Sequence, residues 1–274
     1  MVARSGGDAV SAARTFRAYL GTSFRKNLAY RSEVWLSILF GLVAIVIQAA
    51  IWRALLGDGA VEGITVDDMV TYVIITTVIS VVSLHRLVRD VDERLRGGDI
   101  AVDLVKPMHY PALQLADQLG RSAFQLAFVV APMVAIAALV FNVQAPASPA
   151  AGFAFVAALA IALLVSFTQG LLLALLAFWF LTTFHFIWAN GALLTLFGGA
   201  NLPLWFFPDR LETVARLLPY QFVAFVPAAI WLGEIAGGDL GRILALGVIW
   251  VAIQAGACQA LWSAAVRRLT VQGG

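Results

Sequence analysis

Charged residues are scarce in this 274-residue sequence, where Asp, Glu, Lys and Arg together make up 12%. A typical soluble domain carries about 25%. The hydrophobic fraction is correspondingly high, at 61%. A soluble fold of this length could not enclose so much apolar surface in one core, so lipid must cover the rest. The composition therefore predicts an all-α membrane protein, and we expect residues 1–274 to form a single transmembrane domain.

Cysteine and lysine are almost absent, which excludes two kinds of site. The single cysteine, Cys258, rules out an internal disulfide and a zinc site built from cysteines. Only Lys26 and Lys106 occur, and they follow Arg25 and Val105. The phosphate-binding loop of ATPases requires a glycine directly before its lysine. This chain therefore cannot hydrolyse ATP by that route.

Catalytic and metal-binding patterns are also missing. His85, His109 and His185 lie far apart and have no second ligand three or four residues away, so we expect no metal site. No Gly-x-Ser-x-Gly motif occurs. We expect no catalytic residue and no cofactor in this chain. The expected spans also hold no ionisable residue at mid-membrane, which argues against a carrier with a carboxylate relay.

Apolar segments suffice for about six membrane spans, each needing about 20 residues. From Ser122 to Pro208 there is no Asp, Glu, Lys or Arg, a stretch long enough for three spans. Pro146 and Pro149 divide it once, and residues 182–185 divide it again. The expected spans are residues 35–56, 69–84, 122–141, 152–181, 186–206 and 243–266.

The distribution of positive charge predicts the orientation. If the N-terminus lies inside, most of the 18 Lys and Arg residues fall on inner segments. The first outer loop, residues 57–68, contains four acidic residues and no Lys or Arg. Positive charge favours the cytoplasmic side, so we expect both termini in the cytoplasm and the chain in the inner (plasma) membrane. The outer positive charges are then Arg53, Arg210, Arg216 and Arg242.

Residues 10–31 predict a helix on the inner membrane surface, within a cytoplasmic interfacial region of residues 1–31. Ala13, Phe16, Leu20, Phe24 and Leu28 share one side at helical spacing. Such helices lie along the headgroups with their basic residues toward anionic lipid. The alternative is a frayed basic N-terminus. The segment has no continuous apolar stretch of the length found in a secretory signal.

The inner loop between the second and third expected spans combines dense mixed charge with aliphatic residues. Leu87, Val88, Val91 and Leu95 share a helical face, so we expect the second span to continue as an amphipathic helix. The pair Gly97–Gly98 would end it. Exposed aliphatics among charges suit docking of a soluble partner, and the alternative is a plain connecting loop.

The outer segment 201–241 is rich in proline yet apolar. Two half-helices are expected, at residues 209–218 and 221–232, which enter the membrane and return. Non-helical backbone at that depth must be buried in protein or line a cavity. We therefore expect this re-entrant hairpin to lie against a neighbouring element or to close a pathway.

Polar residues within or near spans have two expected roles. Asp117 and Arg121 lie one helical turn apart near the inner end of the third span, and we expect local charge neutralisation, with a functional relay as the alternative. Uncharged amides in spans normally face other helices. They are Gln48, Gln125, Gln169, Asn190, Gln254 and Gln259.

Three features together resemble the permease subunits of type-2 ATP-binding-cassette exporters. The first is a surface helix followed by six spans. The second is the inner sequence RLRGGDI at residues 94–100, followed by LVKP at 104–107. The third is the outer sequence LPYQF at 218–222, with Pro227 beyond it. The resemblance covers nearly the whole chain, and the order of the motifs matters more than any one of them.

The resemblance implies how such a chain works. The permease would form a homodimer, or a heterodimer with a related permease, whose substrate pathway is lined by spans one, two and five. Separate ATPase subunits would bind ATP and magnesium, and no nucleic acid is implied. A secondary carrier or channel without an ATPase is the alternative. The substrate remains open, with a hydrophobic or amphipathic cargo favoured only weakly.

The same resemblance assigns two sets of residues. The ATPase-coupling surface would comprise Arg89, Val91, Arg94, Leu95, Arg96, Gly97, Gly98, Asp99, Ile100, Asp103 and Leu104. The re-entrant hairpin would comprise Pro208, Pro219, Tyr220, Gln221, Phe222 and Pro227.

Overall fold

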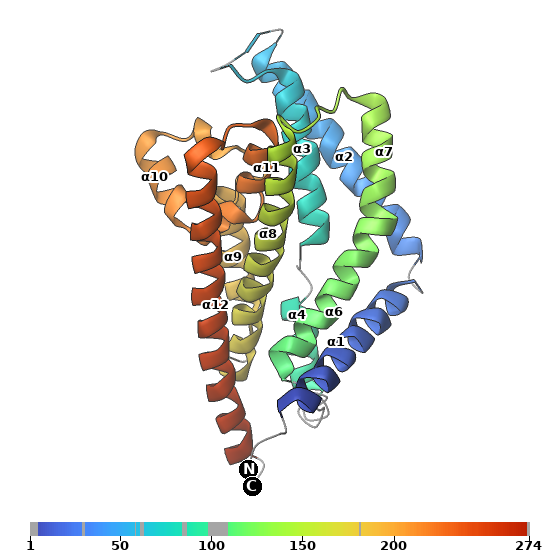
Figure 1. Ribbon diagram of the computed structural model, residues 1–274, viewed down its shortest axis with the longest axis vertical. Coiled ribbons are helices and arrows are strands. Elements are labelled where there is room, and N and C mark those ends of the chain that lie inside the picture. Colours follow the sequence, from blue (N-terminus) through green and yellow to red (C-terminus); the bar gives the residue numbers. More distant parts are fainter. Residues whose placement is uncertain are drawn as a thin grey trace.

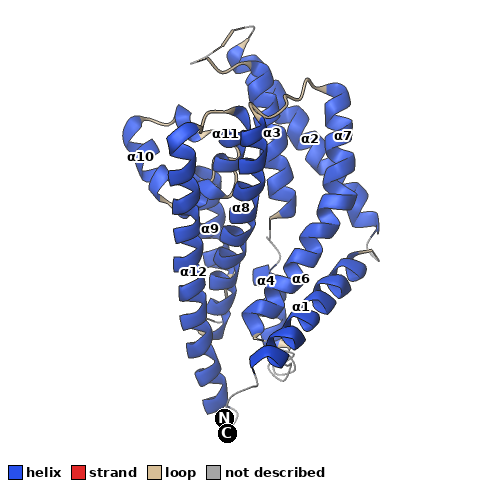
Figure 2. Cartoon of the chain, viewed as in Figure 1, coloured by secondary structure: helices blue, strands red, loops and turns tan. Residues whose placement is uncertain are grey.

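The chain forms a bundle of helices with both termini at one end (Figure 1). The computed structural model describes residues 5–28, 31–57, 59–60, 63–83, 87–97, 109–180 and 182–272. These residues form helices and turns and no strand (Figure 2), which confirms the predicted fold class. We call the end that carries both termini the inner end and the opposite end the outer end.

Five helical segments in the described residues are long and apolar enough to cross a membrane. They correspond to expected spans one, two, three, four and six. Their helices are α2 (Arg31–Leu56), α3 (Val66–Val82), α6 (Tyr110–Gln125) with η1 (Leu126–Val130) and α7 (Ala131–Val140), α8 (Pro149–Leu175), and α12 (Gly237–Gln272).

Local sequence explains where several of these helices begin. The Thr65 hydroxyl accepts a hydrogen bond from the backbone N–H of Asp68, and the Asp68 carboxylate accepts one from the Thr65 backbone N–H. This capping box starts α3 a turn before the expected residue 69. Ser148 caps α8, and Pro149 occupies its first turn, where no backbone donor is needed. The expected division at Pro146 and Pro149 is confirmed.

The third span is not a regular α-helix throughout. Residues Leu126–Val130 form a π-helical turn, in which the backbone N–H of Ala131 donates to the carbonyl of Leu126. Pro132 follows directly and has no backbone N–H to offer the preceding turn. The π turn realigns the hydrogen bonds around this proline, so the span continues from α6 into α7.

The fifth apolar segment is shorter than expected. Helix α9 (Phe184–Phe197) has 14 residues, or about 21 Å of length at 1.5 Å per residue. The hydrocarbon core is about 30 Å thick. The expected helix over residues 186–206 is therefore helical only to Phe197, because Gly199 takes a positive φ of 75° that ends the regular path.

The outer segment after α9 folds into short helices, as expected. They are the 3-10 turn η3 (Leu204–Phe206), α10 (Asp209–Leu217), the 3-10 turn η4 (Pro219–Phe222) and α11 (Phe225–Leu232). The first expected half-helix matches α10. The second is divided, because the 3-10 turn precedes a new start at Phe225.

Helix α11 is enclosed by protein. It packs against α3 and α8, and its residues from Phe225 to Ile230 are all buried. The indole of Trp231 donates to the carbonyl of Gln144, and the backbone N–H of Ala147 donates to the carbonyl of Trp231. These bonds fix the end of α11 to the loop between α7 and α8.

Two apolar clusters hold the bundle together. The larger lies toward the outer end and joins α2, α3, α7, α8 and α11 through side chains such as Ile45, Tyr72, Met133, Val165 and Phe225. The smaller lies toward the inner end and joins α8 and α12 to α4 (Leu87–Arg96). Its buried side chains include Leu87, Val91, Leu171, Leu175 and Trp262.

Candidate functional site

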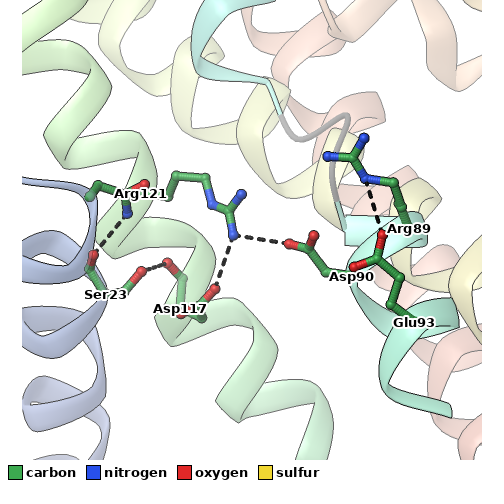
Figure 3. A network of polar contacts seen from close by, with 7 residues as sticks. Ser23, Arg89, Asp90, Glu93, Asp117 and Arg121 are labelled. Atoms are coloured by element: carbon green, nitrogen blue, oxygen red, sulfur yellow. Dashed lines mark hydrogen bonds and ion pairs between the residues drawn. The ribbon is translucent and has the colours of Figure 1, made fainter. Parts of the chain in front are cut away.

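Three helices meet at the inner end around a small set of polar side chains (Figure 3). These helices are α1 (Ser5–Asn27), α4 and α6. We call the four side chains that connect them the inner polar cluster. Its members are Ser23, Asp90, Asp117 and Arg121.

Helix α4 is separate from the second span, which corrects the expected continuous helix. Helix α3 ends at Val82, and Ser83 has an extended backbone with φ −71° and ψ 152°. An α-helix cannot pass through a residue with that ψ. At its other end α4 stops at Arg96, directly before Gly97, as the sequence predicts.

Three of the four residues of the expected aliphatic face of α4 are buried, which corrects the expectation of exposed aliphatics at those positions. Leu87, Val88 and Val91 are 2%, 6% and 0% exposed. Helix α4 packs against α8, so these side chains meet the membrane bundle rather than solvent. Val91 is therefore not accessible to a soluble partner, although it belongs to the expected coupling surface.

The opposite face of α4 carries exposed charge. Arg89 and Glu93 form an ion pair at 3.7 Å, and their side chains are 64% and 70% exposed. Such a pair contributes at most about 1 kcal/mol. Burial of each aliphatic side chain contributes about 1.5–3 kcal/mol. Apolar packing therefore holds α4 in place, and the charged face is free to make contacts elsewhere.

Arg121 joins α6 to α4. Its Nη2 atom lies 3.0 Å from an Asp90 carboxylate oxygen and 3.5 Å from one of Asp117. The Arg121 side chain is 17% exposed, so water screens these contacts only in part. The sequence predicted that Asp117 and Arg121 neutralise each other within α6, and the structure adds the ion pair between Arg121 and Asp90 of α4. Asp90 and Arg121 are 31 residues apart, so no local pattern in the sequence predicted their contact.

Helix α1 lies closely along α6. The Ser23 hydroxyl donates to the backbone carbonyl of Asp117 at 2.6 Å. A methyl group at Gly120 would lie 2.8 Å from Cβ of Ser23 and overlap the carbonyl of Leu20. The ring of Phe24 meets that of Phe124 edge-on at 5.8 Å. The sequence correctly predicted a helix here, and α6 covers part of its apolar side.

Together with Glu33 of α2, the three helices line a polar cavity of about 370 Å³. Acidic, basic and amide side chains line it, and the described residues hold no group of His, Cys, Asp or Glu that could bind a metal ion. The polar contacts in this region connect α1, α4 and α6. The lining residues are Ser23, Lys26, Asn27, Glu33, Leu87, Asp90, Glu93, Arg94, Gln114, Asp117, Gln118 and Arg121.

Part of the expected coupling surface can be placed and part cannot. Arg89 lies on the exposed face of α4, and the backbones of Leu95 and Arg96 form its last turn. The side chains of Leu95 and Arg96 lie outside the described residues. So do Gly98, Asp99, Ile100, Asp103 and Leu104.

The expected hairpin residues lie together at the outer end. Pro208 precedes α10, Pro219 begins η4, and Pro227 lies in the first turn of α11. Gln221 and Phe222 are buried, and the Gln221 amide donates to the carbonyl of Arg216. The Tyr220 hydroxyl donates to Asn190 of α9 at 3.4 Å.

A comparison with protein families matches most of the chain. The family model described as ABC-2 family transporter protein matches residues 43–273. No curated protein matches the chain. The matched region contains the second to sixth apolar segments, helix α4 and the outer segment of short helices. This chain therefore belongs to the ABC-2 family of transporter proteins.

Proposed function

We propose that this membrane permease subunit forms the substrate pathway of an ATP-driven exporter and is coupled to separate ATPase subunits through helix α4. Family membership supports the permease assignment. One observation supports the coupling role of α4. It is anchored to the bundle on one face and presents charge, including the Arg89–Glu93 pair, on the other.

The buried face of α4 connects this helix to the membrane region, so that a displacement of α4 would be passed on to other helices. Helix α4 packs on α8, and Arg121 connects it to α6. Helix α6 in turn holds α1 through Ser23 and the close approach at Gly120. A force applied to the exposed face of α4 would therefore act on the inner ends of both α8 and α6. ATP and magnesium would be bound by the partner ATPase.

The same proposal assigns the remaining parts. Two permease chains, identical or related, would form the pathway along their interface. Both termini would face the cytoplasm, with the chain in the inner (plasma) membrane. The outer segment from η3 to α11 would form a re-entrant hairpin, a role supported by the burial of α11 against α3 and α8.

The first test is to purify the tagged chain from its own host in a mild detergent and identify its partners by mass spectrometry. We expect a stoichiometric ATPase with a phosphate-binding loop, with or without a second permease chain. If the chain came out alone from several detergents, the alternative of a carrier or channel without an ATPase would replace this proposal.

A charge-reversal pair tests the docking face itself. Arg89→Glu reverses an exposed charge on α4 and is expected to reduce the recovered ATPase. Arg242→Glu is the matched control, because Arg242 is also exposed and pairs with Asp239 at 3.6 Å, on α12 near the outer end. Equal ATPase recovery with both variants would contradict docking on α4.

A further inference from the structure

A second cavity, of about 770 Å³, lies between α8 and α9 beside the end of α3. Pockets of roughly 300–1,000 Å³ accommodate drug-sized molecules. Among the residues that the structure describes, no Asp, Glu, Lys, Arg or His lines this cavity. Its lining residues are Ser83, Val88, Ser166, Gln169, Gly170, Leu173, Ile187, Trp188, Asn190, Gly191, Ala192, Leu194, Thr195 and Leu196.

Two polar groups in the lining lack partners. Gln169 is 8% exposed, and its Nε2 has no hydrogen-bond partner among the described residues. The hydroxyl of Ser166, one helical turn earlier on α8, is also without one. Buried polar groups are normally hydrogen-bonded. An amide nitrogen donates only, so the group that Gln169 lacks is a hydrogen-bond acceptor.

The preceding residue of α8, Thr168, contacts a span amide that does have a hydrogen-bond partner. Thr168 donates to the Gln254 amide oxygen of α12 at 2.6 Å. That pair confirms the expected role of span amides as contacts between helices. Gln169 is the next residue along α8, yet its amide nitrogen has no hydrogen-bond partner in the part of the chain that the structure describes. Its role is therefore different from that of Gln254.

Helix α9 forms the side of the cavity that lies at the surface of the chain. None of the residues of α9 is buried, and Ile187, Trp188 and Leu196 are 38%, 69% and 50% exposed. An apolar helix with this exposure in a membrane protein faces lipid or another apolar chain. In the single chain, the cavity is therefore accessible past α9 to a ligand in the bilayer.

We propose that this cavity binds a neutral amphiphile, with the hydrogen-bond acceptor of its uncharged head group at Gln169 and its apolar part against α9. The described lining residues carry no charge, and they would give an ionic head group no counterion, so we expect the head group to be neutral. That such an amphiphile is also the transported substrate rests on the proposed exporter function. Binding itself requires no ATPase.

The probe is a monoacylglycerol with a dibrominated stearoyl chain, in phosphatidylcholine nanodiscs that contain the purified chain. Bromine quenches tryptophan fluorescence at short range, and Trp188 lines the cavity. We expect a saturable component of quenching at low mole fraction, and Trp188→Phe should remove it. Dibromostearate, which has the same tail with a carboxylate head, should not reproduce that component.

Two matched glycine substitutions test the location. Gly191→Leu adds a side chain into the cavity, and Gly256→Leu adds the same side chain on α12. Neither added Cβ would meet another atom within 4 Å. We expect Gly191→Leu to abolish saturable quenching and Gly256→Leu to preserve it.

Gln169→Leu separates binding from folding. Because it removes an amide whose nitrogen has no partner, it should leave the melting temperature unchanged or raise it. We expect the affinity for the monoacylglycerol to fall up to about tenfold. A residue with only a structural role would instead lower the melting temperature.

Several outcomes would overturn the inference. Quenching that rises in proportion to probe without saturation, or that persists in Gly191→Leu, would mean that ordinary boundary lipid contacts Trp188. Equal binding of dibromostearate would contradict a neutral head group. If the chain showed saturable binding but recovered no ATPase, the binding site would be supported and the exporter function contradicted. If it recovered an ATPase but showed no saturable binding, the exporter function would be supported and the binding site contradicted.

Discussion

The outer and inner ends of this molecule are stabilised in different ways. At the outer end, α3, α8 and α11 bury large side chains such as Tyr72 and Phe225 almost completely. At the inner end, α4 is packed on α8 by smaller aliphatic side chains and α1 lies closely along α6, and the polar cluster around Arg121 adds an ion pair between α4 and α6. Large buried side chains tolerate little displacement, whereas the ion pairs at the inner end can exchange partners. The comparison suggests a fixed outer end and an adjustable inner end.

Hydrogen bonds to irregular backbone strengthen the outer end further. The Tyr72 hydroxyl donates to the carbonyl of Gly199 at 2.6 Å, and the Thr76 hydroxyl donates to that of Ala200 at 3.3 Å. The backbone N–H of Phe225 donates to the carbonyl of Gly198. The first three carbonyls after α9 thus each have a donor, as non-helical backbone away from water requires.

The largest effect is expected at Gly199. Its φ is 75°, and an added Cβ would lie 2.7 Å from Cβ of Phe225. Gly199→Val should destabilise the fold by about 3–5 kcal/mol, from backbone strain and overpacking together. Thermal unfolding in detergent measures this. Gly237→Val is the control, because its φ is 61° and no atom lies within 4 Å, so only the strain should remain.

Tyr72→Phe should have the next largest effect. The change removes the hydroxyl that donates to the Gly199 carbonyl and leaves that buried oxygen without this donor, at a cost of about 1–3 kcal/mol. Tyr220→Phe, which loses a longer bond of 3.4 Å to Asn190, should cost less in the same unfolding assay. The reverse order would mean that this contact does not hold the end of α9.

Gly120→Ala tests the inner end. Its methyl group would overlap the carbonyl of Leu20, so α1 must move away from α6, at a cost of about 1–2 kcal/mol. Distances between spin labels on α1 and α6 should lengthen. Gly21→Ala is the matched control, since nothing lies within 4 Å of its added Cβ. Unchanged distances in Gly120→Ala would show that α1 is held elsewhere.

Arg121→Gln should have the smallest effect on stability, about 1 kcal/mol, because its ion pairs are partly exposed. Hydrogen exchange is the sharper measurement. Exchange should quicken in α4 and stay constant in α11. Arg89→Gln, which loses an ion pair with the largely exposed Glu93, should change neither helix. Faster exchange in α11 with Arg121→Gln would remove the distinction between the two ends.

Local signals in the sequence predicted much of the fold. Pro149, the pair Gly97–Gly98 and the prolines of the outer segment act on their own backbone or on the next turn, so their effects can be read from neighbours in the chain. The end of α4 at Arg96, the break before α8 and the bounds of α10 to within one residue were predicted for that reason.

Contacts between distant residues could not be predicted in the same way. Helical spacing identified the aliphatic face of α4 but not what covers it, and α8 buries it instead of leaving it exposed. The bond between Arg121 and Asp90 depends on how α4 and α6 pack. Gly199 is a local signal for the end of α9, but the hydrogen bonds from Tyr72 and Thr76 of α3 to the backbone after it join distant residues, and no local pattern reveals them.

The shortness of α9 also has a consequence for how the protein is made. Helix α9, at about 21 Å, is too short to cross the hydrocarbon core on its own, and α11, with 8 residues, is shorter still. Their backbone partners are supplied by α3 and by the loop before α8, which are synthesised earlier. During biogenesis this outer segment must therefore settle onto a surface that the first four spans have already assembled, before or together with the insertion of α12.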